Sequence, residues 1–158
     1  MNIINATEMS LERMHSIFQS KGCQTEIVET LPADPDLGLS RDAYLHVDFP
    51  QHLPVVVWLD SHADHQIRMR VIVADREHRD QMGETELMNF AADCNQQIQY
   101  FGSLSPRNSL GITLEYRLPY NQGILENTIF RAAEEMSFGG WYARKHISTL
   151  DVEKNIRS

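Results

Sequence analysis

Apolar and polar residues alternate at every second position in two stretches between residues 43 and 73, and this alternation constrains the fold most strongly. Successive side chains of a β-strand point to opposite faces of a sheet, so the pattern predicts strands with one buried and one solvated face. An almost continuous apolar run at residues 55–59 lies between them and predicts a central strand. Short connections indicate antiparallel hairpins. The alternating apolar residues are Ala43, Leu45, Val47 and Phe49, then Ile67, Met69, Val71 and Val73.

Three other segments repeat their apolar residues at helical spacing. The first covers residues 8–21, with Thr7 as the expected N-cap and Gly22 as the expected C-terminal stop. The second covers residues 84–98, and the third follows Gly123 and is expected to end or break at Gly139-Gly140. The apolar stripes are Leu11, Met14, Ile17 and Phe18, then Leu87, Ala91, Cys94 and Ile98, then Leu125, Ile129, Ala132 and Met136.

Further strands are predicted at residues 24–30, 100–104 and 112–118, with a loop at 105–109. The order α-β-β-β-β-α-β-β-α predicts a single α+β domain, residues 1–158, whose antiparallel sheet carries helices mainly on one face. Its core spans about residues 8–147, and a frayed tail is expected from about residue 151. Arg68, Arg70 and Glu115 are predicted to be exposed. The residues predicted to be buried are Leu45, Val47, Val57, Met69, Val71, Ile112 and Leu114.

The chain is acidic, with a net charge of −8, which disfavours binding to nucleic acid phosphates and to anionic membranes. No segment reaches the roughly 20 apolar residues of a membrane span, and the first ten residues lack the pattern of a signal peptide. Cys23 and Cys94 are therefore expected to be reduced thiols in a cytoplasmic protein, with a disulfide between them as the alternative.

Two histidine clusters suggest chemistry. His62-Ala-Asp-His65 could ligate zinc, but it lies in a predicted hairpin turn, where such residues are common for conformational reasons. His46 and His52 lie near Asp48 and could relay protons, although pairing across strands explains the same arrangement. We expect neither a metal nor another cofactor.

Motifs for other reactions are missing from the sequence. There is no glycine-rich phosphate loop and no nucleophile elbow. Cys94 is predicted to be buried, and Cys23 has no identifiable base, so neither indicates a thiol enzyme. No catalytic residue is predicted.

Aromatic residues near the C-terminus indicate an interface instead. Trp141 and Tyr142 follow the double glycine, and aromatic residues on a terminal segment often anchor an interface or complete the chain's own core. Trp58 and Ile72 are expected on the outer register of the sheet, where a second subunit could cover them. We therefore predict a two-fold homodimer with these four residues at its interface.

Charged residues are also expected on the outer face of the sheet. Arg68, Arg70 and Arg117 lie there with Glu115 and Asp48. They predict either a surface of mixed ion pairs, which contribute little, or a recognition surface for an acidic partner. The ion-pair interpretation is favoured.

Several segments together resemble a known family. They are residues 20–23, residues 87–95 with Asn95 at the end, residues 114–119 and residues 123–130. In order and spacing they are similar to the YbjN-type domain of a bacterial family described as sensory transduction regulators. That family resembles the class I chaperones of type III secretion in fold, and those chaperones are typically homodimers. The resemblance implies a protein partner and no catalytic residues.

The sequence therefore predicts a non-enzymatic protein-binding module, chaperone-like or regulatory, with a protein partner. Two alternatives stay open. One is a small metal-dependent enzyme built around His62 and His65. The other is an acidic inhibitor or immunity-type protein that covers a basic active site.

Overall fold

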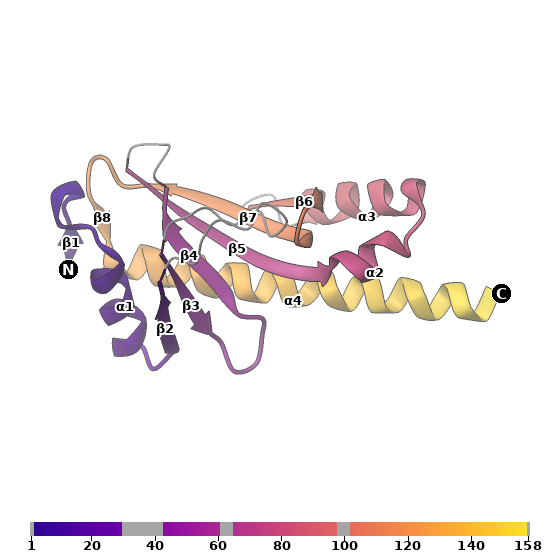
Figure 1. Ribbon diagram of the computed structural model, residues 1–158, viewed down its shortest axis with the longest axis horizontal. Helices are drawn as coiled ribbons and strands as arrows, with labels where there is room; N and C mark the ends of the chain where they lie inside the picture. The colour runs from indigo at the N-terminus through magenta and orange to yellow at the C-terminus, as the bar shows by residue number, and fades with distance from the viewer. Residues whose placement is uncertain (1, 30–42, 61–64, 98–101, 158) are drawn as a thin grey trace.

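The computed structural model describes residues 2–29, 43–60, 65–97 and 102–157, and in residues 149–157 it describes the backbone alone (Figure 1). In chain order the elements are β1 (Ile3–Ile4), η1 (Ala6–Glu8), α1 (Leu11–Ser20), β2 (Gln24–Val28), β3 (Tyr44–Asp48), β4 (Val55–Leu59), β5 (Gln66–Asp75), α2 (Arg76–Asp80), α3 (Glu84–Gln97), β6 (Ser103–Asn108), β7 (Gly111–Pro119), β8 (Ile124–Leu125) and α4 (Glu126–Arg157).

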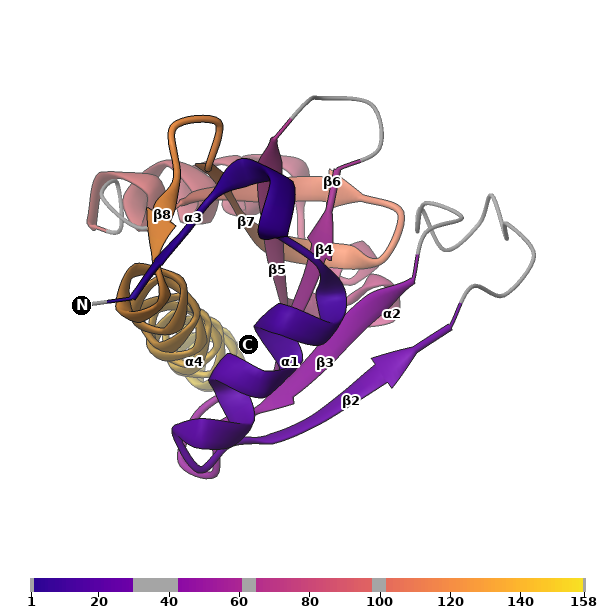
Figure 2. The ribbon, with the colours of Figure 1, turned by 90° about the vertical axis from the view of Figure 1, so that its left-hand side faces the viewer.

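Six antiparallel strands form the main sheet in the order β2-β3-β4-β5-β7-β6, and β1 pairs with β8 separately. Figure 2 shows α1 and α4 together on one side of the curved sheet. The predicted α+β architecture, with an antiparallel sheet and helices packed on it, is confirmed. The short β1, η1, α2 and β8 elements were not predicted.

The register of the sheet follows the period-two pattern. Leu45, Val57, Met69 and Tyr116 form one row across β3, β4, β5 and β7. All seven residues predicted to be buried are fully buried. The prediction of strand faces from alternation is therefore correct along the whole centre of the sheet.

The predicted exposure of the outward-facing residues is wrong for Arg70, which is only 7% exposed. Arg68 and Glu115 are half-buried. Arg70 does point to the outer face, since its row on the sheet contains Val56 and Glu115. Its neighbours on that face cover it, because long side chains with opposite charges pack flat on one another and on an aromatic ring.

Helix α1 begins at Leu11, and the expected start at residue 8 with Thr7 as N-cap is wrong. The Ser10 hydroxyl accepts a hydrogen bond from the Arg13 N–H at 3.1 Å and caps the helix instead. The end of the helix is as predicted. Gly22 has a φ of +84°, and the N–H groups of Gly22 and Cys23 return to the carbonyls of Gln19 and Phe18.

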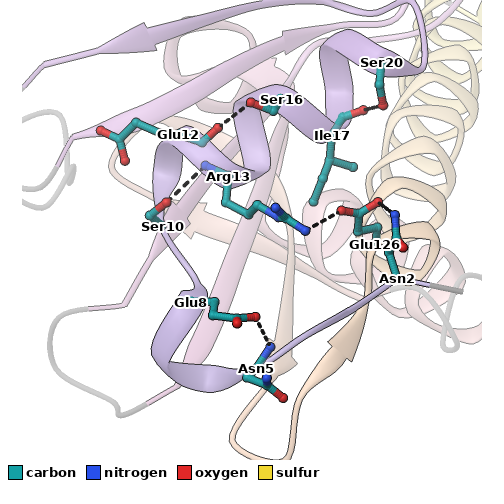
Figure 3. Close-up of polar contacts among 10 residues, drawn as sticks. All are labelled: Asn2, Asn5, Glu8, Ser10, Glu12, Arg13, Ser16, Ile17, Ser20 and Glu126. Atoms are coloured by element: carbon teal, nitrogen blue, oxygen red, sulfur yellow. Dashed lines mark hydrogen bonds and ion pairs between the residues drawn. The ribbon is translucent and has the colours of Figure 1, made fainter.

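Glu126, the first residue of α4, connects that helix to the N-terminal segment (Figure 3). Its carboxylate accepts hydrogen bonds from Arg13 of α1 at 2.9 Å and from Asn2 at 3.3 Å. A carboxylate is also favourable in the first turn of a helix, where backbone N–H groups lack partners. This side chain therefore fixes the start of α4 against α1.

Helix α4 continues through Gly139 and Gly140, where it was expected to end or break. It also remains helical to Arg157, through the segment where fraying was expected. Position 140 is a glycine because there is no room for a side chain between the helix and the sheet. A Cβ on Gly140 would overlap the Val71 side chain of β5 and would lie 3.4 Å from Leu53 Cδ1. The glycine lets the helix backbone approach the sheet more closely than any other residue would.

Strand β6 covers Ser103–Asn108, so the loop expected at residues 105–109 is largely strand. Tyr100 and Ile98, expected in a strand and a helix, lie outside the described residues. Pro106 is tolerated in β6 because this strand lies at the edge of the sheet, where a missing N–H costs no ladder hydrogen bond. The register with β7 shifts between Ser105 and Asn108.

Asn95 of α3 covers part of this edge. Its Oδ1 accepts a hydrogen bond from the Leu104 N–H at 2.5 Å, and its Nδ2 donates to the Leu104 carbonyl at 3.4 Å. The side-chain amide of Asn95 thus forms the two hydrogen bonds that a neighbouring strand would otherwise form with buried Leu104. Unpaired backbone groups at a sheet edge otherwise bind other chains.

We expect Gly140→Ala to lower the free energy of unfolding by about 1–3 kcal/mol, although alanine is the better helix former. The added methyl has no room beside the buried Val71. Urea denaturation measures the change. Gly83→Ala is the control, because a Cβ there meets nothing within 4 Å. Equal stability of the Gly140 variant and the wild type would contradict the close packing.

We expect Asn95→Ala to lower the free energy of unfolding by about 1–3 kcal/mol, because it leaves the N–H and carbonyl of buried Leu104 without this partner. Thermal and urea denaturation both report the loss. Gln96→Ala, at the next and exposed position of the same helix, should change stability far less. Similar losses in the two variants would show that the edge contact does not matter.

Candidate protein-binding surface

Phe138 and Tyr142 of α4 are large apolar side chains that remain 45% and 47% exposed. They lie one turn apart, with ring centroids 6.5 Å from each other. Trp141 and His52 pack beside them, and the His52 ring lies 5.3 Å from Phe138 and 5.5 Å from Trp141. We call these four residues, His52, Phe138, Trp141 and Tyr142, the aromatic surface.

Helical spacing explains why these aromatic residues gather. Positions 138, 141 and 142 stand in the relation i, i+3 and i+4, so they occupy one face of α4. The opposite face packs on the sheet and contains small or apolar residues. They are Met136, Ser137, Gly140, Ala143 and Ile147.

Two polar contacts hold this helix against the sheet. The Ser137 hydroxyl donates to the Leu53 carbonyl at 2.5 Å, and the Arg144 guanidinium donates to the carbonyls of Ile72 and Val73 at 2.9 Å each. Both contacts flank Gly140 in the sequence. The aromatic surface therefore lies on a helix whose position is fixed by hydrogen bonds to the side that faces the sheet.

Charged residues lie at both ends of the aromatic surface. Glu134 is exposed and Glu135 is half-buried one turn before Phe138, and Lys145 is exposed one turn after Trp141. The Lys145 ammonium lies 4.5 Å from the centroid of the Trp141 ring, within the range of a cation–π interaction. The surface is thus apolar in its centre, acidic at one end and basic at the other.

The structure brings together only two of the four predicted interface residues. Trp141 and Tyr142 belong to the aromatic surface. Phe138 was not predicted to belong to an interface, because the helix was expected to end directly after it. His52 was expected in a cluster with His46 and Asp48, whereas its ring packs on α4. The i, i+3, i+4 spacing of the three aromatic residues was the signal that could have identified this surface.

Trp58 and Ile72 lie on the outer register of the sheet, away from the face that α4 covers. Trp58 is only 9% exposed, since the guanidinium carbons of Arg68 and Arg70 lie 5.5 and 5.1 Å from the centroid of its ring. Side chains of the same chain therefore cover Trp58. Ile72 is 38% exposed, and it lies on β5 rather than on the helix that carries Phe138, Trp141 and Tyr142.

The outer face carries an ion-pair network. Arg70 donates from Nη2 and Nε to the same oxygen of Glu115, at 2.6 and 2.9 Å. Arg68 lies 3.3 Å from Asp60 and 3.9 Å from Glu115. These contacts support the ion-pair interpretation of the outer face, because the cations already have carboxylate partners. Asp48 pairs elsewhere, with His46 at 3.8 Å, and Arg117 is exposed.

We expect Glu115→Ala to lower the free energy of unfolding by about 3 kcal/mol, because it leaves the buried Arg70 guanidinium without its carboxylate. Chemical denaturation, followed by tryptophan fluorescence, measures the loss. Arg117→Ala removes an exposed charge two positions along the same strand and should change stability by less than about 0.5 kcal/mol. A neutral result for Glu115→Ala would contradict the structural role of the network.

The histidine and carboxylate residues in the described ranges form no group of three or more that could hold a metal ion. His62 lies outside the described residues. His65 has a φ of 58°, and its ring packs against Tyr120 at 5.5 Å. The pairing of His46 with Asp48 involves two exposed or half-exposed side chains on the outer face.

Both cysteines are free thiols, so the alternative of a disulfide is wrong. Burial, and then the charge of Asp93, raises the pKa of Cys94 to about 11. Burial, and then Glu134, also raises the pKa of Cys23. Both shifts favour the neutral thiol, which is neither a nucleophile nor a metal ligand.

A cleft of about 360 Å³ lies between the end of β5, α2 and α4. Asp75, His78 and Arg144 are among its lining residues. Asp75 caps α2 by accepting from the His78 N–H at 2.7 Å, and Arg144 donates to two carbonyls of β5. These groups therefore serve the local fold.

Comparison with known proteins gives the fold and no more. No protein-family model matches the chain, and no curated protein matches it. An uncharacterized protein from Methanothermobacter thermautotrophicus has a similar crystal structure, with a TM-score of 0.59 and 12% sequence identity. The similarity covers 89% of this chain and 98% of that one. Among the described helices, none is long and apolar enough to cross a membrane.

Proposed function

We propose that this protein is a non-enzymatic binding module whose partner is another protein, and that the aromatic surface is where the partner binds. The observation that supports this most directly is the exposure of Phe138 and Tyr142 on a helix that is otherwise firmly packed. Trp141, at their side, adds a third aromatic ring that is partly exposed.

Aromatic residues contribute much of the free energy of protein association, because they bury a large area with few rotatable bonds. The cost of ordering the surface is small here, since Ser137 and Arg144 already hold α4 in place. Charged residues at the rim of an apolar centre are typical of such interfaces. The arrangement therefore suits protein recognition better than the binding of a small molecule, which needs a concave site.

The net charge of −8 supports a protein partner over nucleic acid. The two free thiols are ordinary in the cytoplasm, where we place the protein. A chaperone-like or regulatory role extends the resemblance to the YbjN family, and that resemblance stays a prediction. Nothing in the ion pairs of the outer sheet face favours the acidic-inhibitor alternative over this proposal.

A photo-cross-linking amino acid in place of Tyr142 should yield a covalent adduct with a protein partner in living cells. Mass spectrometry of the adduct identifies the partner and the linked residue. The control places the same amino acid at Met88, which is 48% exposed on α3. We expect adducts of a defined mass from position 142 and much less from position 88. If position 142 yields no adduct, the aromatic surface does not bind protein.

A further inference from the structure

We propose that β2 is a second binding site, at which an extended, basic segment of a partner protein adds to the sheet as a further strand. This inference goes beyond the proposed function, because it concerns an edge of the sheet and not the aromatic surface on α4. It is carried by the difference between the two edges of the sheet and by the charge at one of them.

The six-stranded sheet has two edge strands, β6 and β2, and they differ in how they are built. Pairing at β6 is obstructed, because Asn95 occupies the backbone groups of Leu104, Pro106 lacks an N–H, and the register with β7 shifts. Strand β2 contains no proline, and its five residues, Gln24–Val28, all pair with β3 in a continuous antiparallel register.

The other side of β2 pairs with no strand in the part of the chain that the structure describes (Figure 2). An edge strand directs alternate N–H and carbonyl groups away from its sheet, and a further strand can bind them there. Strand addition of this kind is a recurrent way for a folded domain to bind an extended polypeptide.

The register of β2 determines which side chains an added strand meets. Ile27 pairs with Leu45, which is fully buried on the inner face of the sheet. Glu26 pairs with His46, on the outer face. Paired strands keep their residues in rows, so the residue of an added strand opposite Glu26 lies on the outer face. The residues on either side of it lie on the inner face.

On the inner face, an added strand extends an apolar row. Ile27 continues the row that Leu45, Val57 and Met69 form across β3, β4 and β5. Ile27 and Leu11 of α1 pack at the margin of the core and remain partly exposed. An apolar side chain opposite Ile27 therefore removes apolar surface from water, which favours binding.

The edge at β2 is acidic. Glu26 is exposed on the strand, Glu29 is exposed directly after it, and Glu12 is exposed on α1, which packs on β2. Within the described ranges, these carboxylates have no ion-pair partner. Opposite charges across a strand pair stabilise it, so a basic side chain opposite Glu26 complements this edge.

The same charge selects the occupant. A second copy of β2 brings the same carboxylates to the contact, between chains that each carry a net charge of −8. Like charges that face each other across a strand pair destabilise it. The edge therefore suits an extended segment of a different protein, in which basic residues alternate with apolar ones.

A short synthetic peptide in which lysine and valine alternate is the probe. Amide hydrogen exchange of the full-length protein, followed by NMR, measures protection residue by residue. We expect the peptide to slow exchange at alternate amides of β2 and to leave the amides of β6 unchanged. A peptide of the same composition with its lysines and valines in separate blocks should not do so. Nor should the alternating peptide with every backbone N–H methylated, because it cannot donate hydrogen bonds to β2.

Charge reversal tests the acidic edge. We expect Glu26→Lys to weaken binding of the lysine–valine peptide at least about tenfold, measured by fluorescence anisotropy, and to favour a peptide with glutamate in place of lysine. Asp93→Lys is the matched control, because it makes the same charge change at an exposed position of α3, beside β6. We expect that control to change the affinity less than about threefold. Circular dichroism checks that both variants are folded.

Absence of protection at β2 in the presence of the peptide overturns this inference. Equal binding of the alternating and block peptides, or equal weakening by Glu26→Lys and Asp93→Lys, shows only attraction to an acidic protein and overturns it as well. Protection of β2 that increases with protein concentration, without peptide, makes a second copy the occupant and also overturns it. Each of these outcomes leaves the proposed function of the aromatic surface unaffected.

Discussion

The close packing of α4 on β5 at Gly140 is the contact on which the arrangement of this molecule depends. It sets the distance between the longest helix and the central strand, because no side chain separates the helix backbone from Val71 and Leu53. Ser137 and Arg144 then hold the helix at that distance through hydrogen bonds to sheet carbonyls. The core below the helix and the aromatic surface above it are therefore positioned by the same contact.

The two faces of the sheet are completed in different ways. Helices cover the inner face with apolar side chains, as is usual for an antiparallel sheet with one solvated face. On the outer face, Arg68 and Arg70 lie over Trp58, and Glu115 joins the two arginines. An apolar ring is thereby protected from water without a further layer of structure, so this face needs no second subunit to cover Trp58.

Sequence periodicity predicted the strands, their inner faces and the fold class, because alternation reports directly on which face of a strand is buried. It failed where tertiary packing decides. Gly140 looked like a helix breaker because its close neighbour Val71 is 69 residues away in the sequence. Arg70 looked exposed because the residues that cover it come from other strands. Phe138 was missed because the helix was expected to end at the glycines that follow it. Two of the four expected interface residues, Trp58 and Ile72, lie on the outer face of the sheet, away from the aromatic surface. Sequence spacing does not report which surfaces of a folded chain lie together.

Asn95 has a consequence for the behaviour of the protein at high concentration. Its amide occupies the backbone N–H and carbonyl of Leu104 on the outer side of β6. A strand from another molecule can pair with β6 there only after the Asn95 amide has moved away. The incoming strand must then form hydrogen bonds with the N–H and carbonyl of Leu104 in its place. Helix α3 thus protects that edge of the sheet from pairing with strands of other molecules while the domain is folded. Loss of a single side chain would remove this protection and leave the fold otherwise unchanged.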